Sequence, residues 1–288
     1  GDVVKVAGNY SSDADILVTL KKKGGNNIFD FWQFATFERG KKIEHLLDTD
    51  LTGIQTVGTD WHAPFIVKAI NNADGDMPDS YAFTGGNHEY TNTGSGGTAT
   101  GRTSMIKVYA DNREVGNGSG ICCKLEIKWT NYVQATNTKK EDGTGREVLI
   151  ENHVLSFDGV EWKTYVEIVP LEDIRIITWY GLQASGVSTI YKSIRYVGAT
   201  NRLLYDGSVE RSTCGDNKTI KVVCGGERHK IEIEIDPTLD VGDRRYYNGV
   251  EGIFSEKYGK IYFNVVSGAV FEKDCMYCLR GKYRFTPA

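Results

Sequence analysis

The stretch Cys123-Lys124-Leu125-Glu126-Ile127-Lys128-Trp129-Thr130 alternates apolar and polar side chains with a period of two. Successive side chains of an extended strand point to opposite faces, so this stretch predicts a strand with one face buried and the other in water. The same alternation recurs at 163–168, 230–235 and 261–265. Burial on one face only is typical of antiparallel sheets.

Further apolar runs bounded by Gly, Asn and Asp predict additional strands. They lie at Ile16–Leu20, Phe65–Ile70, Ser104–Ala110, Val148–Phe157, Ile174–Tyr180, Thr189–Val197, Thr219–Val223 and Gly281–Phe285. The best helical signal, at Lys41–Leu47, predicts only one or two turns. Many strands with little helix predict an all-β fold, a large antiparallel two-sheet β-sandwich of jelly-roll type. No convincing linker interrupts residues 1–288, so we expect a single domain.

The charges and apolar stretches of the sequence limit the classes of binding partner that we expect. The formal net charge is −4, and the only tight basic run, Lys21–Lys23, is followed at once by Gly24 and Gly25. Such a run is typical of a solvated turn, so we expect no nucleic-acid binding. No apolar stretch is long enough to span a bilayer, so we expect no membrane insertion. The 16 Tyr and 5 Trp suit a carbohydrate-binding β protein, although aromatic rings also fill cores.

The cysteines give a weak metal signal. Cys275 and Cys278 form a C-x-x-C, and Cys214 and Cys224 bracket a predicted hairpin. Zinc ribbons usually carry C-x-x-C at both ends, so the pattern favours thiols over zinc. A Cys214–Cys224 disulfide is the alternative for a secreted protein.

The acidic segment 71–79, which contains Asp74, Asp76 and Asp79, resembles a short calcium loop. It lacks the twelve-residue pattern and the closing Glu of an EF-hand, which favours an exposed turn. We therefore expect no cofactor and no metal at the functional site, with a structural calcium at this segment as the alternative.

The segments that break the alternation are the candidates for function. They are Thr59–Pro64, which contains Asp60, Trp61 and His62; Phe83–Tyr90, which contains Asn87 and His88; Arg102, just ahead of a strand; and Trp179–Gln183. Glycine adopts backbone shapes that other residues resist, so the Gly85-Gly86 pair predicts a loop that presents the polar side chains after it. The alternatives are a hairpin turn with satisfied polar groups, a packed histidine and a core tyrosine.

These residue types suit β-elimination next to a uronic-acid carboxylate. Arg102 and Asn87 would neutralise the carboxylate. His88 would act as base or acid with Tyr90 or Tyr180 as its partner, and His62 is a further candidate. Trp61, Trp179 and Gln183, with Asp60 beside them, would hold neighbouring sugars. The sequence has no paired acidic signature of a glycosidase and no G-x-S-x-G motif. It also has no P-loop and no dinucleotide-binding motif.

The run from Trp61 through His88, with Arg102, Leu171–Asp173 and Tyr180–Gln183, resembles β-sandwich domains of bacteriophage tail and baseplate proteins, and also jelly-roll polysaccharide lyases. The resemblance covers about residues 50 to 190. It implies a receptor-binding or depolymerase domain at a host surface, extracellular or in a virion tail, and a homotrimer if the domain belongs to a tail fibre. The leading hypothesis is a lyase for an acidic surface polysaccharide. The alternatives are a non-catalytic glycan- or receptor-binding module and a structural assembly protein.

Overall fold

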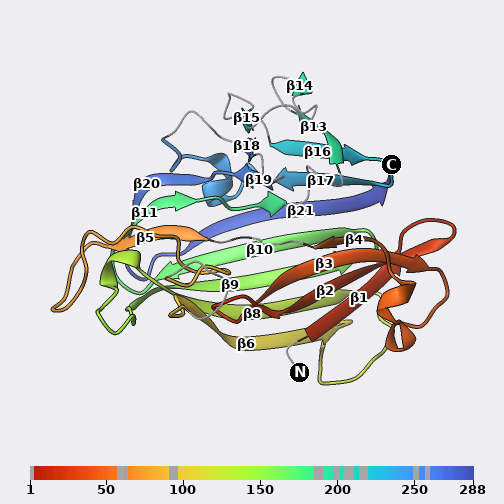
Figure 1. Ribbon diagram of the computed structural model, residues 1–288, viewed down its shortest axis with the longest axis horizontal. Coiled ribbons are helices and arrows are strands. Elements are labelled where there is room, and N and C mark those ends of the chain that lie inside the picture. Colours follow the sequence, from red (N-terminus) through yellow and green to blue (C-terminus); the bar gives the residue numbers. More distant parts are fainter. Residues whose placement is uncertain are drawn as a thin grey trace.

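The computed structural model describes residues 3–56, 62, 64–90, 97–184, 191–197, 202–203, 211–213, 220–248, 253–256 and 260–288. Antiparallel strands dominate this part of the chain and form four sheets (Figure 1). The only helical elements among the described residues are short 3-10 turns, η1 (Ile43–His45), η2 (Asp48–Asp50), η3 (Thr136–Thr138) and η4 (Asp240–Asp243). The prediction of an all-β sandwich with little helix is confirmed, and η1 lies within the predicted helical segment.

The first 56 residues contribute the N-terminal sheet, in the order β1-β2-β3-β4. Its strands are β1 (Val3–Asn9), β2 (Ala14–Lys23), β3 (Ile28–Glu38) and β4 (Thr52–Thr56). The basic run at Lys21–Lys23 belongs to β2, and Lys23 is buried, so the prediction that this run is a solvated turn is wrong. The pairing of β2 with β3 continues through these lysines, since Lys21 lies opposite Asp30 and Lys23 opposite Ile28.

A ten-stranded sheet forms the other main layer, in the order β14-β13-β16-β17-β21-β10-β9-β8-β6-β7. Its strands are β6 (Gly101–Ala110), β7 (Arg113–Val115), β8 (Leu125–Gln134), β9 (Glu147–Asp158), β10 (Glu161–Pro170), β13 (Tyr191–Val197), β14 (Arg202–Leu203), β16 (Lys221–Gly226), β17 (His229–Ile235) and β21 (Tyr277–Pro287). The predicted alternation is visible in β8 and β10, where every second residue is buried.

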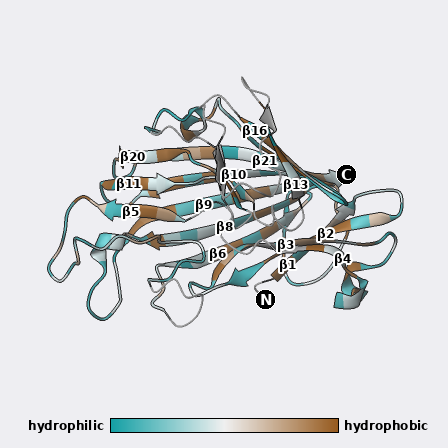
Figure 2. Ribbon diagram, turned by 45° about the horizontal axis from the view of Figure 1, so that its top comes forward, coloured by the Kyte–Doolittle hydropathy of each residue, from teal (hydrophilic) through white to brown (hydrophobic). Residues whose placement is uncertain are grey.

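Two smaller sheets complete the arrangement. The three-stranded sheet has the order β20-β11-β5 and contains β5 (Phe65–Ala69), β11 (Ile174–Trp179) and β20 (Val266–Phe271). Figure 2 shows these strands side by side, with hydrophobic and hydrophilic residues intermingled along them. The other sheet has the order β12-β19-β18-β15 and contains β12 (Gln183–Ala184), β15 (Arg211–Thr213), β18 (Ile253–Glu256) and β19 (Lys260–Phe263).

Aromatic contacts join the N-terminal sheet to the ten-stranded sheet. The ring centroids of Phe29 and Trp129 are 5.5 Å apart, and those of Phe34 and Phe285 are 4.2 Å apart. Phe29, Trp129 and Phe34 are buried within a single hydrophobic cluster that also includes residues of the three-stranded sheet. Because burial of apolar area is the main stabilising contribution to folding, this cluster is the core of the sandwich.

None of the helical elements in the described ranges is long and apolar enough to cross a membrane. Cys123 lies just before β8, which begins at Leu125, so the strand starts two residues later than the predicted stretch Cys123–Thr130. Cys224 is a free thiol in the core, where burial raises its pKa. Its proposed disulfide partner, Cys214, lies outside the described residues.

Candidate functional site

A tight turn at Gly85–His88 lies at the end of a segment paired with β5. Phe65 and Thr84 exchange two backbone hydrogen bonds, and the amide of His88 donates to the Gly85 carbonyl at 3.0 Å. Gly85 and Gly86 have φ values of 75° and 50°. Both lie in the left-handed region that glycine enters without a steric penalty, which explains why the sequence carries a glycine pair here.

Buried polar side chains hold this turn in place. The Asn26 amide nitrogen donates to the carbonyls of Gly86 and His88, at 3.0 Å each, and its oxygen accepts from the Thr100 amide at 2.8 Å. The Thr100 hydroxyl accepts from the Gly85 amide and donates to the His88 carbonyl. Since both side chains are buried and bonded, the turn is anchored from behind.

A row of aromatic rings runs from this turn to β11 and β19. The Phe83 ring lies 5.4 Å from the His88 ring and 5.8 Å from the Tyr180 ring, and Tyr180 lies 4.5 Å from Tyr262. Phe83, His88 and Tyr180 are half-buried, whereas Tyr262 is buried. We call these four residues the aromatic surface. It brings together two of the predicted catalytic residues, His88 and Tyr180.

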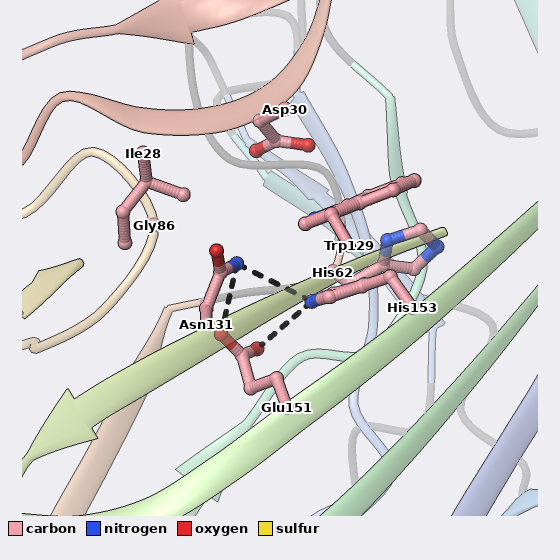
Figure 3. A pocket seen from close by; sticks show the side chains of 8 residues that line it. All are labelled: Ile28, Asp30, His62, Gly86, Trp129, Asn131, Glu151 and His153. Carbon is pink, nitrogen blue, oxygen red and sulfur yellow. Dashed lines mark hydrogen bonds and ion pairs between the residues drawn. The ribbon is translucent and has the colours of Figure 1, made fainter. Parts of the chain in front are cut away.

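On the inner side of the same turn lies a polar cavity between β3 and the ten-stranded sheet (Figure 3). Its lining consists of Ile28, Asp30, His62, Gly86, Trp129, Asn131, Glu151 and His153. Its volume of about 10 Å³ is that of a single water molecule and far below that of a sugar ring. The cavity can therefore hold a water molecule but not a sugar ring.

The polar groups of the cavity form a connected network. Glu151 lies 3.6 Å from the Nε2 atom of His153, and the Asn131 amide lies 3.4 Å from Glu151 and 3.5 Å from His153. The His153 ring stacks on Trp129 with a centroid distance of 4.6 Å. Burial of a carboxylate and an imidazole is costly without such partners, so the network stabilises groups that the apolar core would otherwise exclude.

His62 also lines the cavity. Its ring lies 5.4 Å from that of His153, and its Nε2 atom lies 2.7 Å from the Thr164 hydroxyl. The Trp179 indole donates to the His62 carbonyl at 2.6 Å. Burial and the neighbouring His153 hold the pKa of His62 well below its ordinary value, so its imidazole is neutral near pH 7. The cavity that these groups line can hold only a water-sized molecule.

The remaining predicted catalytic residues lie in other surroundings. Arg102 forms a bidentate ion pair with Glu147, at 2.6 and 2.9 Å, and stacks on the Tyr132 ring at 4.2 Å. The Tyr90 hydroxyl donates to the Ala135 carbonyl at 3.2 Å, and burial raises the pKa of its phenol to about 12. Tyr90 therefore stays protonated near neutral pH and could serve as an acid rather than as a base.

The predicted sugar-binding residues also lie in different surroundings. Trp179 is fully buried against Phe65. Gln183 is buried, and its backbone exchanges two hydrogen bonds with the Tyr283 hydroxyl. Asn87 is half-buried in the turn. Asp60 and Trp61 lie outside the described residues.

Four polar residues of the cavity were not predicted from the sequence, namely Asp30, Asn131, Glu151 and His153. Asn131 occupies an inward position of β8, and Glu151 and His153 occupy inward positions of β9. Their signal is a polar side chain at an inward position of an alternating strand, which conflicts with a purely apolar core. Asp30 lies on β3, a strand that the sequence analysis did not predict.

At the acidic segment 71–79, for which calcium was the alternative prediction, an arginine supplies the positive charge. Arg146 contacts Asp76 at 3.3 Å and Glu172 at 2.6 Å, and the buried Asp76 also accepts from the Ala73 amide at 2.8 Å. Within the described ranges, no group of three or more His, Cys, Asp or Glu side chains could hold a metal ion. The guanidinium therefore balances the carboxylates of this loop directly.

Neither a protein-family model nor a curated protein matches this sequence. Among solved structures, the fold resembles part of a GH36 α-galactosidase from Geobacillus stearothermophilus, solved with stachyose, at 8% identity and a TM-score of 0.50 over 99% of this chain and 40% of that one. An α-galactosidase from Lactobacillus brevis matches at 7% identity and a TM-score of 0.49 over 99% and 39%. A galactose 1-epimerase from Lactobacillus acidophilus matches at 9% identity and a TM-score of 0.35 over 99% of both chains.

This chain thus spans about two-fifths of the length of the α-galactosidases that it resembles. At these identities the likeness concerns the fold alone.

Proposed function

We propose that this chain binds carbohydrate and that the aromatic surface is its binding site. The observation that carries the proposal is the contiguous contact of Phe83, His88 and Tyr180, three half-buried rings beside a turn anchored by Asn26. The apolar C–H faces of sugars stack on such rings, and a rigid turn lowers the entropy lost on binding. The resemblance to a GH36 α-galactosidase supports the same ligand class by analogy of fold.

The test is a glycan-binding measurement with Phe83→Ala and Tyr180→Ala variants. Each variant should weaken binding at least about tenfold, because it removes one stacking ring. Tyr109→Ala is the matched control, since Tyr109 is half-buried on β6 and contacts Lys128 rather than the aromatic surface. Unchanged affinity in both variants, with both still folded, would contradict the proposed site.

A polysaccharide lyase that cleaves an acidic polysaccharide by β-elimination is the second candidate. It is favoured by one observation, namely that His88 and Tyr180 both contact the ring of Phe83, so that an imidazole and a phenol belong to one aromatic surface. In this mechanism His88 removes the proton next to the uronate carboxylate, and Tyr180 protonates the leaving oxygen. Arg102 would have to leave its ion pair with Glu147 to neutralise that carboxylate.

The lyase hypothesis has a direct assay. Incubation with uronic-acid polysaccharides should produce the ultraviolet absorbance of a new C=C bond, and His88→Ala should abolish it. Glycan binding without any such absorbance would leave the non-catalytic module as the function. A bacteriophage tail or other extracellular location, and a homotrimer, remain parts of this proposal, and light scattering of the purified chain tests the trimer.

A further inference from the structure

Two cations lie directly opposite each other on the three-stranded sheet. Lys68 on β5 pairs with Arg175 on β11 in the antiparallel register. Arg175 is exposed and Lys68 is half-buried. Like charges placed directly across neighbouring strands destabilise a sheet, so this pair needs a reason.

No carboxylate compensates this pair in the part of the chain that the structure describes. Lys68 donates to the Pro78 carbonyl at 3.2 Å and lies 5.8 Å from the Tyr81 ring, and neither Lys68 nor Arg175 has a described acidic partner within 4.0 Å. The ten-stranded sheet offers a contrast. Lys163 and Lys282 also lie opposite each other, but they contact Glu161 at 3.8 Å and Glu234 at 3.4 Å.

Two segments of the chain lead from the uncompensated pair to the aromatic surface. Tyr180 of the aromatic surface directly follows β11 and stands five positions after Arg175. Along the neighbouring segment, Tyr81 precedes Phe83, and its ring is 62% exposed beside Lys68. The exposed Tyr81 side chain therefore lies beside a pair of cations that has no acidic partner among the described residues.

We propose that Lys68 and Arg175 form an anion-binding subsite for a uronic-acid residue of the bound glycan, with Tyr81 stacking on the sugar ring. This inference rests on the proposed carbohydrate binding and specifies an acidic ligand for it. The planar guanidinium of Arg175 matches a carboxylate with two parallel hydrogen bonds, and the Lys68 ammonium adds a point charge. Binding of the anion relieves the repulsion between the two cations, which gives the acidic glycan an advantage over a neutral one.

The experiment measures the affinity of a uronate oligosaccharide, its carboxyl-reduced neutral form and a sulfated oligosaccharide by calorimetry at low and high salt. Lys68→Gln and Arg175→Gln are made singly and together, and Lys163→Gln with Lys282→Gln is the matched control that removes the same charge elsewhere. Each subsite variant should weaken uronate binding about tenfold at low salt, with a smaller effect at high salt. The double variant should keep or raise the melting temperature, because it removes a like-charge pair.

The outcomes separate this inference from the proposed function. Equal affinity for the uronate and neutral glycans, or an equal loss in the control pair, overturns the anion subsite while carbohydrate binding stands. Tighter binding of the sulfated glycan overturns the uronate assignment. Loss of uronate binding in Lys68→Gln and Arg175→Gln but not in Phe83→Ala supports the subsite and contradicts the aromatic surface. If no glycan binds the wild-type chain, both proposals fail.

Discussion

Acid should destabilise this sandwich through the buried histidine at the polar cavity. His62 is 1% exposed, and burial together with the neighbouring His153 holds its pKa well below the ordinary 6.5. In the unfolded chain the ring titrates at its ordinary pKa. Between that value and the lower folded pKa, the unfolded state binds the extra proton, so stability falls as the pH falls below 6.5 and is intact above it.

The size of this loss of stability follows from the linkage between proton binding and folding. If His62 stays neutral in the folded state down to pH 5.0, its contribution to the free energy of unfolding falls by about 2 kcal/mol between pH 7.5 and pH 5.0. Urea unfolding at the two pH values measures this loss. The His62→Gln variant keeps a polar group near the Thr164 hydroxyl and should lose about 2 kcal/mol less than the wild type over the same range.

His45→Gln is the control, because His45 is exposed in η1, and it should keep the wild-type pH dependence. The reasoning is refuted if His62→Gln and the wild type lose the same free energy between the two pH values. If the variant folds poorly, the pH dependence of the chemical shift of the His62 ring can be measured in the wild type instead. A ring that titrates near pH 6.5 in the folded state would contradict the argument.

Three further perturbations test how the structure holds its loops. Asn26→Ala removes the amide that anchors the glycine turn and should lower the free energy of unfolding by about 2 kcal/mol, measured in urea, with weaker glycan binding as a second readout. Arg146→Met leaves the buried Asp76 carboxylate without its cation and should cost about 1–2 kcal/mol because the arginine is 34% exposed; an unchanged urea midpoint would contradict the charge-balancing role. Gly181→Ala should cost about 1–3 kcal/mol by calorimetry, because Gly181 has a φ of 60° and a Cβ atom there would lie 3.1 Å from the Phe263 carbonyl oxygen.

Period-two alternation was sufficient to predict the strands that have one wet face. β8, β10 and β17 alternate in burial as their sequences do. No alternation marks β3, whose sequence Ile28–Glu38 contains consecutive buried residues such as Phe34 and Ala35, which point to opposite faces. A strand covered on both sides carries no alternation, so local pattern alone cannot distinguish it from other apolar segments.

The candidate site likewise has one part that the sequence predicts and one part that it does not. The glycine pair predicts a turn because its backbone requirement is local, and the turn does place His88 near Tyr180 through the ring of Phe83. The pairing of Lys68 with Arg175, by contrast, depends on the register between strands more than 100 positions apart in the chain. Each cation looks like an ordinary solvated residue in its own segment, and only the fold makes them neighbours. Charge that a fold concentrates without compensation is therefore a feature that sequence reading misses, and here it is the feature on which we base the proposal of an acidic ligand.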